Sequence, residues 1–175
     1  LYAVNELKSY KGEPTGTVSA FRIEETTGDL IFLNRQKTGG TDPCHVSLSS
    51  DDRFVFVSNY MTGSVCVLPV LADGSLSEAS QVIQHEGRGT HPVRQTGPHA
   101  HSLIPDPSGK FAVVPDLGLD RLMVYAISLE GSGPVLTEAN QVVLPSGSGP
   151  RVCRFSADSR FCYVVNELTS TITVL

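Results

Sequence analysis

The sequence has 175 residues, of which 40% are hydrophobic, and it contains 16 glycines, 11 prolines and no tryptophan. This composition is typical of one globular domain with many turns. The net charge of −5 and the pI of about 5.5 argue against binding to nucleic acid or to anionic membranes. No stretch approaches the run of about 18 apolar residues that a transmembrane helix needs, so we expect no membrane segment.

The first predicted strand begins at the first residue of the chain. Residues 1–6 lack both an initiator methionine and the basic segment of a signal peptide. We therefore expect the chain to be a fragment, with the remaining parts of the fold supplied by the rest of a longer protein.

Short apolar runs along the chain predict strands, and no long segment has a convincing helical period. In chain order the predicted strands are 1–6, 17–23 and 30–36; 45–48, 54–60, 64–68 and 80–84; 101–104, 111–117, 121–125 and 139–144; and 151–155, 161–167 and 171–175. The runs that end near Asn5, Asn59, Asp116 and Asn166 resemble one another and recur roughly every 50 residues, which indicates an internal repeat.

The repeat predicts the fold. Clusters of Asp, Ser and Gly at 50–53, 107–110 and 157–160 are typical of hairpin turns. Four short antiparallel strands per repeat are typical of a β-propeller blade, whose faces must be covered by neighbouring blades. The predicted fold is all-β: a single partial propeller domain with blade portions at 1–38, 43–84, 98–144 and 150–175. A β-sandwich is the alternative, and the regular spacing argues against it.

Hairpin geometry places a set of polar residues together. The start of the first strand of a hairpin lies beside the end of the second strand, and the first strand of a propeller blade lines the central channel. We therefore expect His45, His99 or His101, Arg151 and Glu167 to converge on one rim of that channel. Polar groups that converge in a concave site predict a binding site. The four Asn and Asp residues at the strand ends are expected to cap turns.

The segment 85–101 holds four of the five histidines together with Arg88 and Arg94. It predicts a long loop on the same rim, and loops of this length are commonly functional. The guanidinium groups suit an anionic substrate because their donors form a fork. A zinc site on His99 and His101 is an alternative, but no third ligand has a suitable spacing, so no metal is predicted. His85 and His91 are expected to be solvated.

The four cysteines, Cys44, Cys66, Cys153 and Cys162, form no C-x-x-C pair. We expect free thiols and a cytoplasmic protein, because disulfides are rare in reducing compartments. Extracellular disulfides remain the alternative.

Several motifs resemble those of the lactonase family of seven-bladed β-propellers, and the resemblance covers nearly the whole chain. The motifs are Gly97–Ser102, Asp106–Lys110, Asp116–Asp120, Gly149–Arg151 and Val164–Leu168. The family includes bacterial 6-phosphogluconolactonases and a fungal carboxy-muconate lactonizing enzyme. The resemblance implies that the chain covers about half of a seven-bladed propeller and that the protein hydrolyses a sugar lactone such as 6-phosphogluconolactone, in the pentose phosphate pathway, without a cofactor.

The resemblance also implies roles for the rim residues. In the lactonizing relative a His, an Arg and a Glu are implicated at these positions, and they match His101 or His99, Arg151 and Glu167. We expect His101 to act as a general base and Arg151 to stabilise an oxyanion, while Glu167 orients them or transfers a proton. The expected substrate-binding residues are His99, His45, Arg94 and Arg88, and a further Arg would lie beyond the last residue.

Two other functions remain open from the sequence. A cycloisomerase would use the same residues on a muconate-like dicarboxylate. A non-catalytic propeller that binds proteins would carry exposed aromatic side chains on its rim. The predicted rim is instead rich in His and Arg, and aromatic residues make up only 7% of the chain, which favours an enzyme.

Overall fold

The computed structural model describes all residues from Leu1 to Leu175. It contains fourteen strands and no helix, which confirms the predicted all-β class. The strands are β1 Tyr2–Asn5, β2 Thr17–Ile23, β3 Leu30–Lys37, β4 Pro43–Leu48, β5 Phe54–Asn59, β6 Ser64–Pro69, β7 Gln81–Gln84, β8 Ile104–Pro105, β9 Phe111–Asp116, β10 Arg121–Ile127, β11 Leu136–Val143, β12 Pro150–Phe155, β13 Cys162–Asn166 and β14 Thr171–Val174. No helix is long and apolar enough to cross a membrane.

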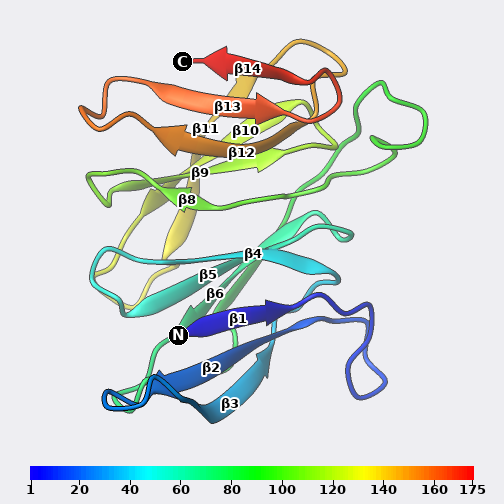
Figure 1. Cartoon of the computed structure of the whole chain (residues 1–175). Helices are drawn as coiled ribbons and strands as arrows, with labels where there is room; N and C mark the ends of the chain where they lie inside the picture. The colour runs from blue at the N-terminus through cyan, green and yellow to red at the C-terminus, as the bar shows by residue number, and fades with distance from the viewer.

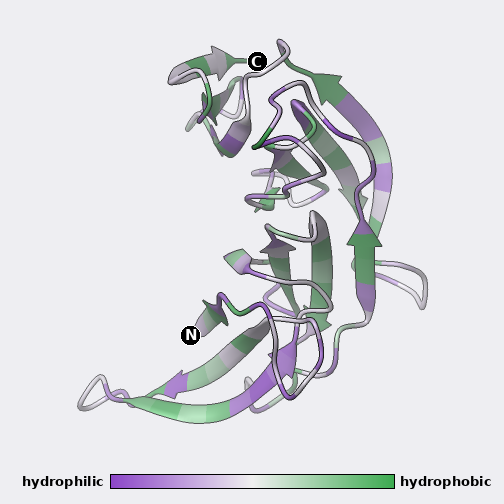
Figure 2. Ribbon diagram, turned by 90° about the vertical axis from the view of Figure 1, so that its right-hand side faces the viewer, coloured by the Kyte–Doolittle hydropathy of each residue, from purple (hydrophilic) through white to green (hydrophobic).

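The strands form four antiparallel sheets, each a simple meander (Figure 1). The sheets are β1-β2-β3, β4-β5-β6-β7, β8-β9-β10-β11 and β12-β13-β14. Figure 2 shows them stacked face to face along an open curve, with the first and last sheets at its two ends. This is the arrangement of consecutive propeller blades.

The apolar core consists of layers between neighbouring sheets. On β5, Val55 and Val57 pack toward the first sheet, whereas Phe56 packs toward the third. Successive side chains of a strand point to opposite faces, so a strand that is covered on both faces is apolar throughout. The side chain of Phe56 is fully buried, which stabilises the fold by roughly 1.5–3 kcal/mol.

The two terminal sheets each have one face that this chain does not cover. Leu30, Ile31 and Phe32 on β3 are exposed, and so are Val165 on β13 and Ile172 on β14. Most of the exposed apolar residues therefore lie in the two terminal sheets, although a few, such as Val82 on β7 and Val143 on β11, are exposed in the middle sheets.

One predicted strand is largely absent. The sequence predicts a strand at 101–104, but β8 contains only Ile104 and Pro105. The register slips by one residue just before β8. Ala100 pairs with Asp116, and Ile104 pairs with Val113. Pro105 also lacks the N–H that a longer ladder would use.

Candidate functional site

A repeated irregularity builds the rim. In three sheets the residue at the end of the second strand pairs with a residue at the start of the innermost segment: Asn59 with Pro43, Asp116 with Ala100, and Asn166 with Pro150. Directly after each pair the register slips by one residue. The slips fall at Cys44 in β4 and Arg151 in β12, and in the third sheet between Ala100 and Ile104, where His101 begins the extra stretch. A β-bulge re-aims a side chain, and bulges are frequent beside active sites.

A second position repeats on the same rim. The residue that follows the end of the second strand is Tyr60, Leu117 or Glu167. Its backbone N–H donates to a carbonyl two residues before the bulge: Tyr60 to Asp42 at 3.0 Å, Leu117 to His99 at 3.0 Å, and Glu167 to Gly149 at 2.8 Å. Each of these three sheets thus holds two neighbouring rim positions in place by backbone hydrogen bonds: the bulge and the residue after the second strand. The side chains at these positions differ from sheet to sheet.

Glu167 lies between two guanidinium groups. Its Oε1 accepts a hydrogen bond from Arg94 at 2.5 Å, and its Oε2 lies 3.0 Å from Nε of Arg151. Arg94 also donates to the hydroxyl of Tyr60 at 3.1 Å, and these hydrogen bonds raise the pKa of Arg94. The loop that carries Arg94 is therefore tied to the second sheet and to the fourth sheet.

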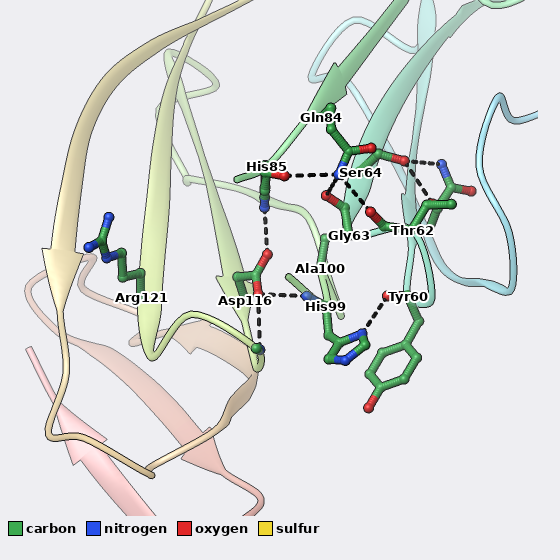
Figure 3. Close-up of polar contacts among 12 residues, drawn as sticks. Tyr60, Thr62, Gly63, Ser64, Gln84, His85, His99, Ala100, Asp116 and Arg121 are labelled. Carbon is green, nitrogen blue, oxygen red and sulfur yellow. Dashed lines mark hydrogen bonds and ion pairs between the residues drawn. The ribbon is translucent and has the colours of Figure 1, made fainter. Parts of the chain in front are cut away.

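His99 is held by Tyr60 (Figure 3). The two rings are stacked, with centroids 4.6 Å apart, and Nδ1 of His99 lies 3.0 Å from the carbonyl oxygen of Tyr60. A carbonyl oxygen only accepts hydrogen bonds, so Nδ1 of His99 carries a proton and donates it to this hydrogen bond. His99 is almost completely buried, and its backbone N–H donates to Asp116 at 2.7 Å.

His101 is a neutral imidazole at the centre of the group. Its ring packs edge-on against Tyr60, and its Nδ1 lies 3.9 Å from Sγ of Cys44. Burial and then the nearby charge of Arg151 lower the pKa of His101 below its ordinary value of 6.5. A base that is neutral at physiological pH is suited to accept a proton.

Cys44 supports His101 and is not a nucleophile. Its thiol lies 3.2 Å from the carbonyl oxygen of His101, to which it donates. Burial, together with the charge of Glu6, raises the pKa of Cys44 to about 12. The thiolate, which is the reactive form, is therefore strongly disfavoured.

His85 is not solvated, and that expectation is wrong. Its side chain is buried, and its Nδ1 lies 2.6 Å from Oδ2 of Asp116 (Figure 3). Its Nε2 lies 2.9 Å from the hydroxyl of Tyr125. Oδ1 of Asp116 accepts hydrogen bonds from the backbone N–H groups of His99 and Gly118. Asp116 thus caps its turn as expected, and it also holds the segment that leads to His101. His91 is exposed, as expected.

The structure brings Arg94, His99, His101, Arg151 and Glu167 into one contact network. His45 is the residue after Cys44 on β4. Its Nδ1 accepts a long hydrogen bond of 3.4 Å from the backbone N–H of Leu103. Burial lowers the pKa of His45 to about 4, with a further contribution from Arg154.

Two further residues complete the picture of the rim. Arg88 is exposed and forms no hydrogen bond or ion pair. Tyr60 was missed by the sequence analysis, although its place in the repeat, equivalent to that of Glu167, is a signal that could have found it. No three His, Cys, Asp or Glu side chains are grouped as metal ligands.

Comparison with known proteins identifies related sequences and structures. A family model described as "Lactonase, 7-bladed beta-propeller" matches residues 1–175. A 6-phosphogluconolactonase from Bacillus subtilis is 38% identical over 94% of this chain and 46% of the relative. The chain therefore spans about half the length of such relatives.

Solved structures also match this chain over about half of their own length. A putative 6-phosphogluconolactonase from Bacteroides fragilis matches with a TM-score of 0.92 and 35% identity, over 99% of this chain and 49% of that one. A periplasmic gluconolactonase from Pseudomonas aeruginosa matches with a TM-score of 0.92 and 40% identity over the same shares. The shared architecture extends over the whole of the described chain.

Proposed function

Because this chain belongs to the lactonase family of seven-bladed β-propellers, we propose that the whole protein hydrolyses a sugar lactone such as 6-phosphogluconolactone. The observation that supports the proposal most directly is that His101, whose pKa is lowered, and the Arg151 guanidinium stand at equivalent bulge positions on neighbouring sheets. One group can accept a proton while the other stabilises negative charge, and ester hydrolysis needs both functions.

In the proposed reaction, water attacks the lactone carbonyl carbon as His101 removes its proton. The carbonyl oxygen becomes an oxyanion, and Arg151 donates hydrogen bonds to it. When the tetrahedral intermediate collapses, the bond between the carbonyl carbon and the ring oxygen breaks. The ring oxygen takes the proton back from His101, which gives a free hydroxyl and a carboxylic acid. Glu167 acts by holding the guanidinium of Arg151 in place.

Arg94 is proposed to bind an anionic substituent of the lactone. Its Nη2 is used by Tyr60 and Glu167, but a guanidinium has five donors, and the side chain remains partly exposed. A phosphate suits the remaining donors. His99, His45 and Arg88 remain proposed substrate-binding residues, and the product would be 6-phosphogluconate, which places the reaction in the pentose phosphate pathway.

The proposal is tested by turnover of purified whole protein on 6-phosphogluconolactone and gluconolactone, compared with spontaneous hydrolysis. We expect enzymatic hydrolysis of at least one of them that a chelator does not affect. Turnover of a muconate-type dicarboxylate, with no hydrolysis of either lactone, would instead support a cycloisomerase. No reaction with any of these substrates would contradict catalysis of this class.

The cytoplasm is the proposed compartment. The four cysteines are free thiols in the structure, which suits a reducing environment. Because the relative from Pseudomonas aeruginosa is named as periplasmic, the compartment needs its own test. Cell fractionation with antibody detection should place the protein with cytoplasmic markers, and recovery in a periplasmic or secreted fraction would contradict the proposal.

A further inference from the structure

One carboxylate on the rim has no role in the mechanism above. The tetrapeptide Val-Asn-Glu-Leu occurs twice, at 4–7 and at 165–168. The first copy contains Glu6, and the second contains Glu167. The first copy lies at the end of β1, and the second lies at the end of β13.

The structure places the two copies in the same setting. Asn5 pairs with Thr17 at the start of β2, and Asn166 pairs with Thr171 at the start of β14. In each copy the Asn amide donates to a hydroxyl two residues further along that strand. These bonds are Asn5 to Ser19 at 2.9 Å and Asn166 to Thr173 at 2.9 Å. Glu6 therefore occupies in the first sheet the rim position that Glu167 occupies in the fourth.

The two carboxylates differ in their partners. Glu167 is partly buried and is bound by two arginines. Glu6 is exposed, and no hydrogen bond or ion pair reaches its side chain. The charge of Glu167 is thus compensated by two arginines, whereas no side chain within residues 1–175 binds the carboxylate of Glu6.

The backbone beside Glu6 is linked to the rest of the site. The carbonyl oxygen of the next residue, Leu7, accepts a hydrogen bond of 3.0 Å from the backbone N–H of Asp42, two residues before Cys44. Cys44 in turn contacts His101. The negative charge of Glu6 raises the pKa of both Cys44 and His101, so the carboxylate acts on both side chains through space.

The site therefore has two ends of different charge. Along the rim, Glu6 of the first sheet comes before Cys44 and His101. Arg151 lies on the fourth sheet, and Arg94 bridges from Tyr60 of the second sheet to Glu167 of the fourth. A free carboxylate accepts hydrogen bonds from hydroxyl groups and repels anions. The two ends thus offer different interactions to a substrate that has hydroxyls on one side and an anionic group on the other.

We propose that Glu6 is a specificity-determining residue that binds hydroxyl groups of a polyhydroxylated lactone and directs any anionic substituent toward the arginine end. The inference rests on the proposed function, since it names the substrate contact of that same site. It assigns Glu6 to orientation of the substrate, and proton transfer remains with His101.

The test uses the whole protein with two substitutions. Glu6→Ala removes the acceptor, and we expect the KM for the lactone to rise about tenfold with little change in kcat, as for the loss of a charge-assisted hydrogen bond. Glu6→Gln keeps the shape but removes the charge. Because Glu6 raises the pKa of His101, this variant should lower that pKa, and the acidic limb of kcat/KM should move to lower pH.

If the role of Glu6 were purely structural, its substitution would not change the pKa of His101. This pKa is therefore also measured directly by NMR. Apart from Glu6, the charged and titratable groups that face this imidazole are Cys44 and His45 from β4, Tyr60, Arg151 from β12 and Glu167, and they must be unchanged in the variant. The matched control is Glu25→Gln, which removes another exposed glutamate, between β2 and β3, and should change neither KM nor the titration.

A raised KM in Glu6→Ala together with a shifted His101 titration in Glu6→Gln supports the inference. An unchanged KM in Glu6→Ala overturns it. A raised KM without a shift of the His101 titration also overturns it, because Glu6 would then act only through the loop that follows β1. Wild-type turnover separates the two proposals: if the wild type hydrolyses lactones while the Glu6 variants behave like it, the inference fails and the proposed function stands. Failure of the wild type overturns the proposed function itself.

Discussion

The two rims of the stacked sheets use polar residues in different ways. On the rim with the hairpin turns at 50–53, 107–110 and 157–160, most polar side chains bond within their own turn: Ser49 donates to Asp51, Ser108 to Asp106, and Ser156 to Asp158. Arg53 is an exception, because it also donates to the carbonyl oxygen of Leu129 at 2.7 Å. On the opposite rim, Arg94 reaches Glu167 and His99 reaches Tyr60, so the contacts join different sheets.

This difference helps to separate structural from functional residues. A polar group that is satisfied by its neighbours in sequence stabilises a turn and needs no other explanation. A polar group whose partners come from another blade depends on the assembled fold, which suits a site that must exist only in the folded protein. The contrast predicts that substitutions on the bulged rim change activity, whereas substitutions on the hairpin-turn rim change only stability.

The largest expected effect is on catalysis. Arg151→Ala should lower kcat by about 100- to 1000-fold, because it removes the donors for the oxyanion. Thermal unfolding should change little, since Arg151 is exposed. Arg160→Ala, on the hairpin-turn rim, is the matched control and should retain full activity. Equal activity loss in both variants would remove the distinction between the rims.

The next effect is on stability. Asp116→Ala leaves the buried His85 and the backbone N–H groups of His99 and Gly118 without their acceptor. We expect a loss of about 3 kcal/mol in the free energy of unfolding, measured by urea denaturation. Asp106→Ala, which removes an Asp from an exposed turn, should cost about 1 kcal/mol or less. A smaller loss for Asp116→Ala than for Asp106→Ala would contradict this account of the network.

Arg94 should affect substrate discrimination rather than catalysis. Arg94→Met should raise the KM for the phosphorylated lactone by about tenfold relative to the unphosphorylated lactone, which corresponds to about 1.4 kcal/mol. Arg88→Ala in the same loop is the comparison, because Arg88 forms no contact in the structure. If Arg88→Ala alone raises this KM ratio, Arg88 and not Arg94 binds the phosphate.

The smallest effect concerns Asp51 on the hairpin-turn rim. Although its slight burial would raise its pKa, hydrogen bonds from Ser49 and Arg53 lower the pKa of Asp51 to about 2. A lowered pKa means that the ionised form stabilises the fold. The contribution is complete above about pH 4 and is lost as the pH falls toward 2.

Asp51→Asn should therefore lower stability at pH 7 by less than about 1 kcal/mol, because the group is exposed to solvent. The difference from the wild type should vanish near pH 2, and activity should be unchanged at neutral pH. Thermal unfolding as a function of pH measures this. A stability difference that grows as the pH falls would have the wrong sign.

The fold could be predicted from sequence because its signals are local. Alternating apolar runs and turn residues such as Asp106 and Gly109 mark each hairpin within a short stretch. The rim could be predicted for the same reason, since hairpin geometry alone places Arg151 beside Glu167. The short β8 was not predicted, because an apolar run does not reveal where a ladder slips by one residue.

The partners of individual side chains could not be predicted. His85 was expected to be solvated because it lies in a polar loop, yet it is buried against Asp116, 31 residues away in sequence. Only the packing of two sheets brings them together, and no periodicity encodes that contact. Tyr60 was not predicted because its role depends on its ring and its carbonyl oxygen, and no polar motif in the sequence marks either.

The bulged rim has a consequence for protein engineering. Its side chains are placed by backbone pairing, and Cys44, His101 and Arg151 hold comparable places although they share no chemistry. A mutant library confined to these places and to the neighbouring positions 6, 60 and 167 would therefore vary the chemistry of the site while leaving the interlocked sheets intact. Such a library offers a compact route to new substrate preferences on an unchanged scaffold.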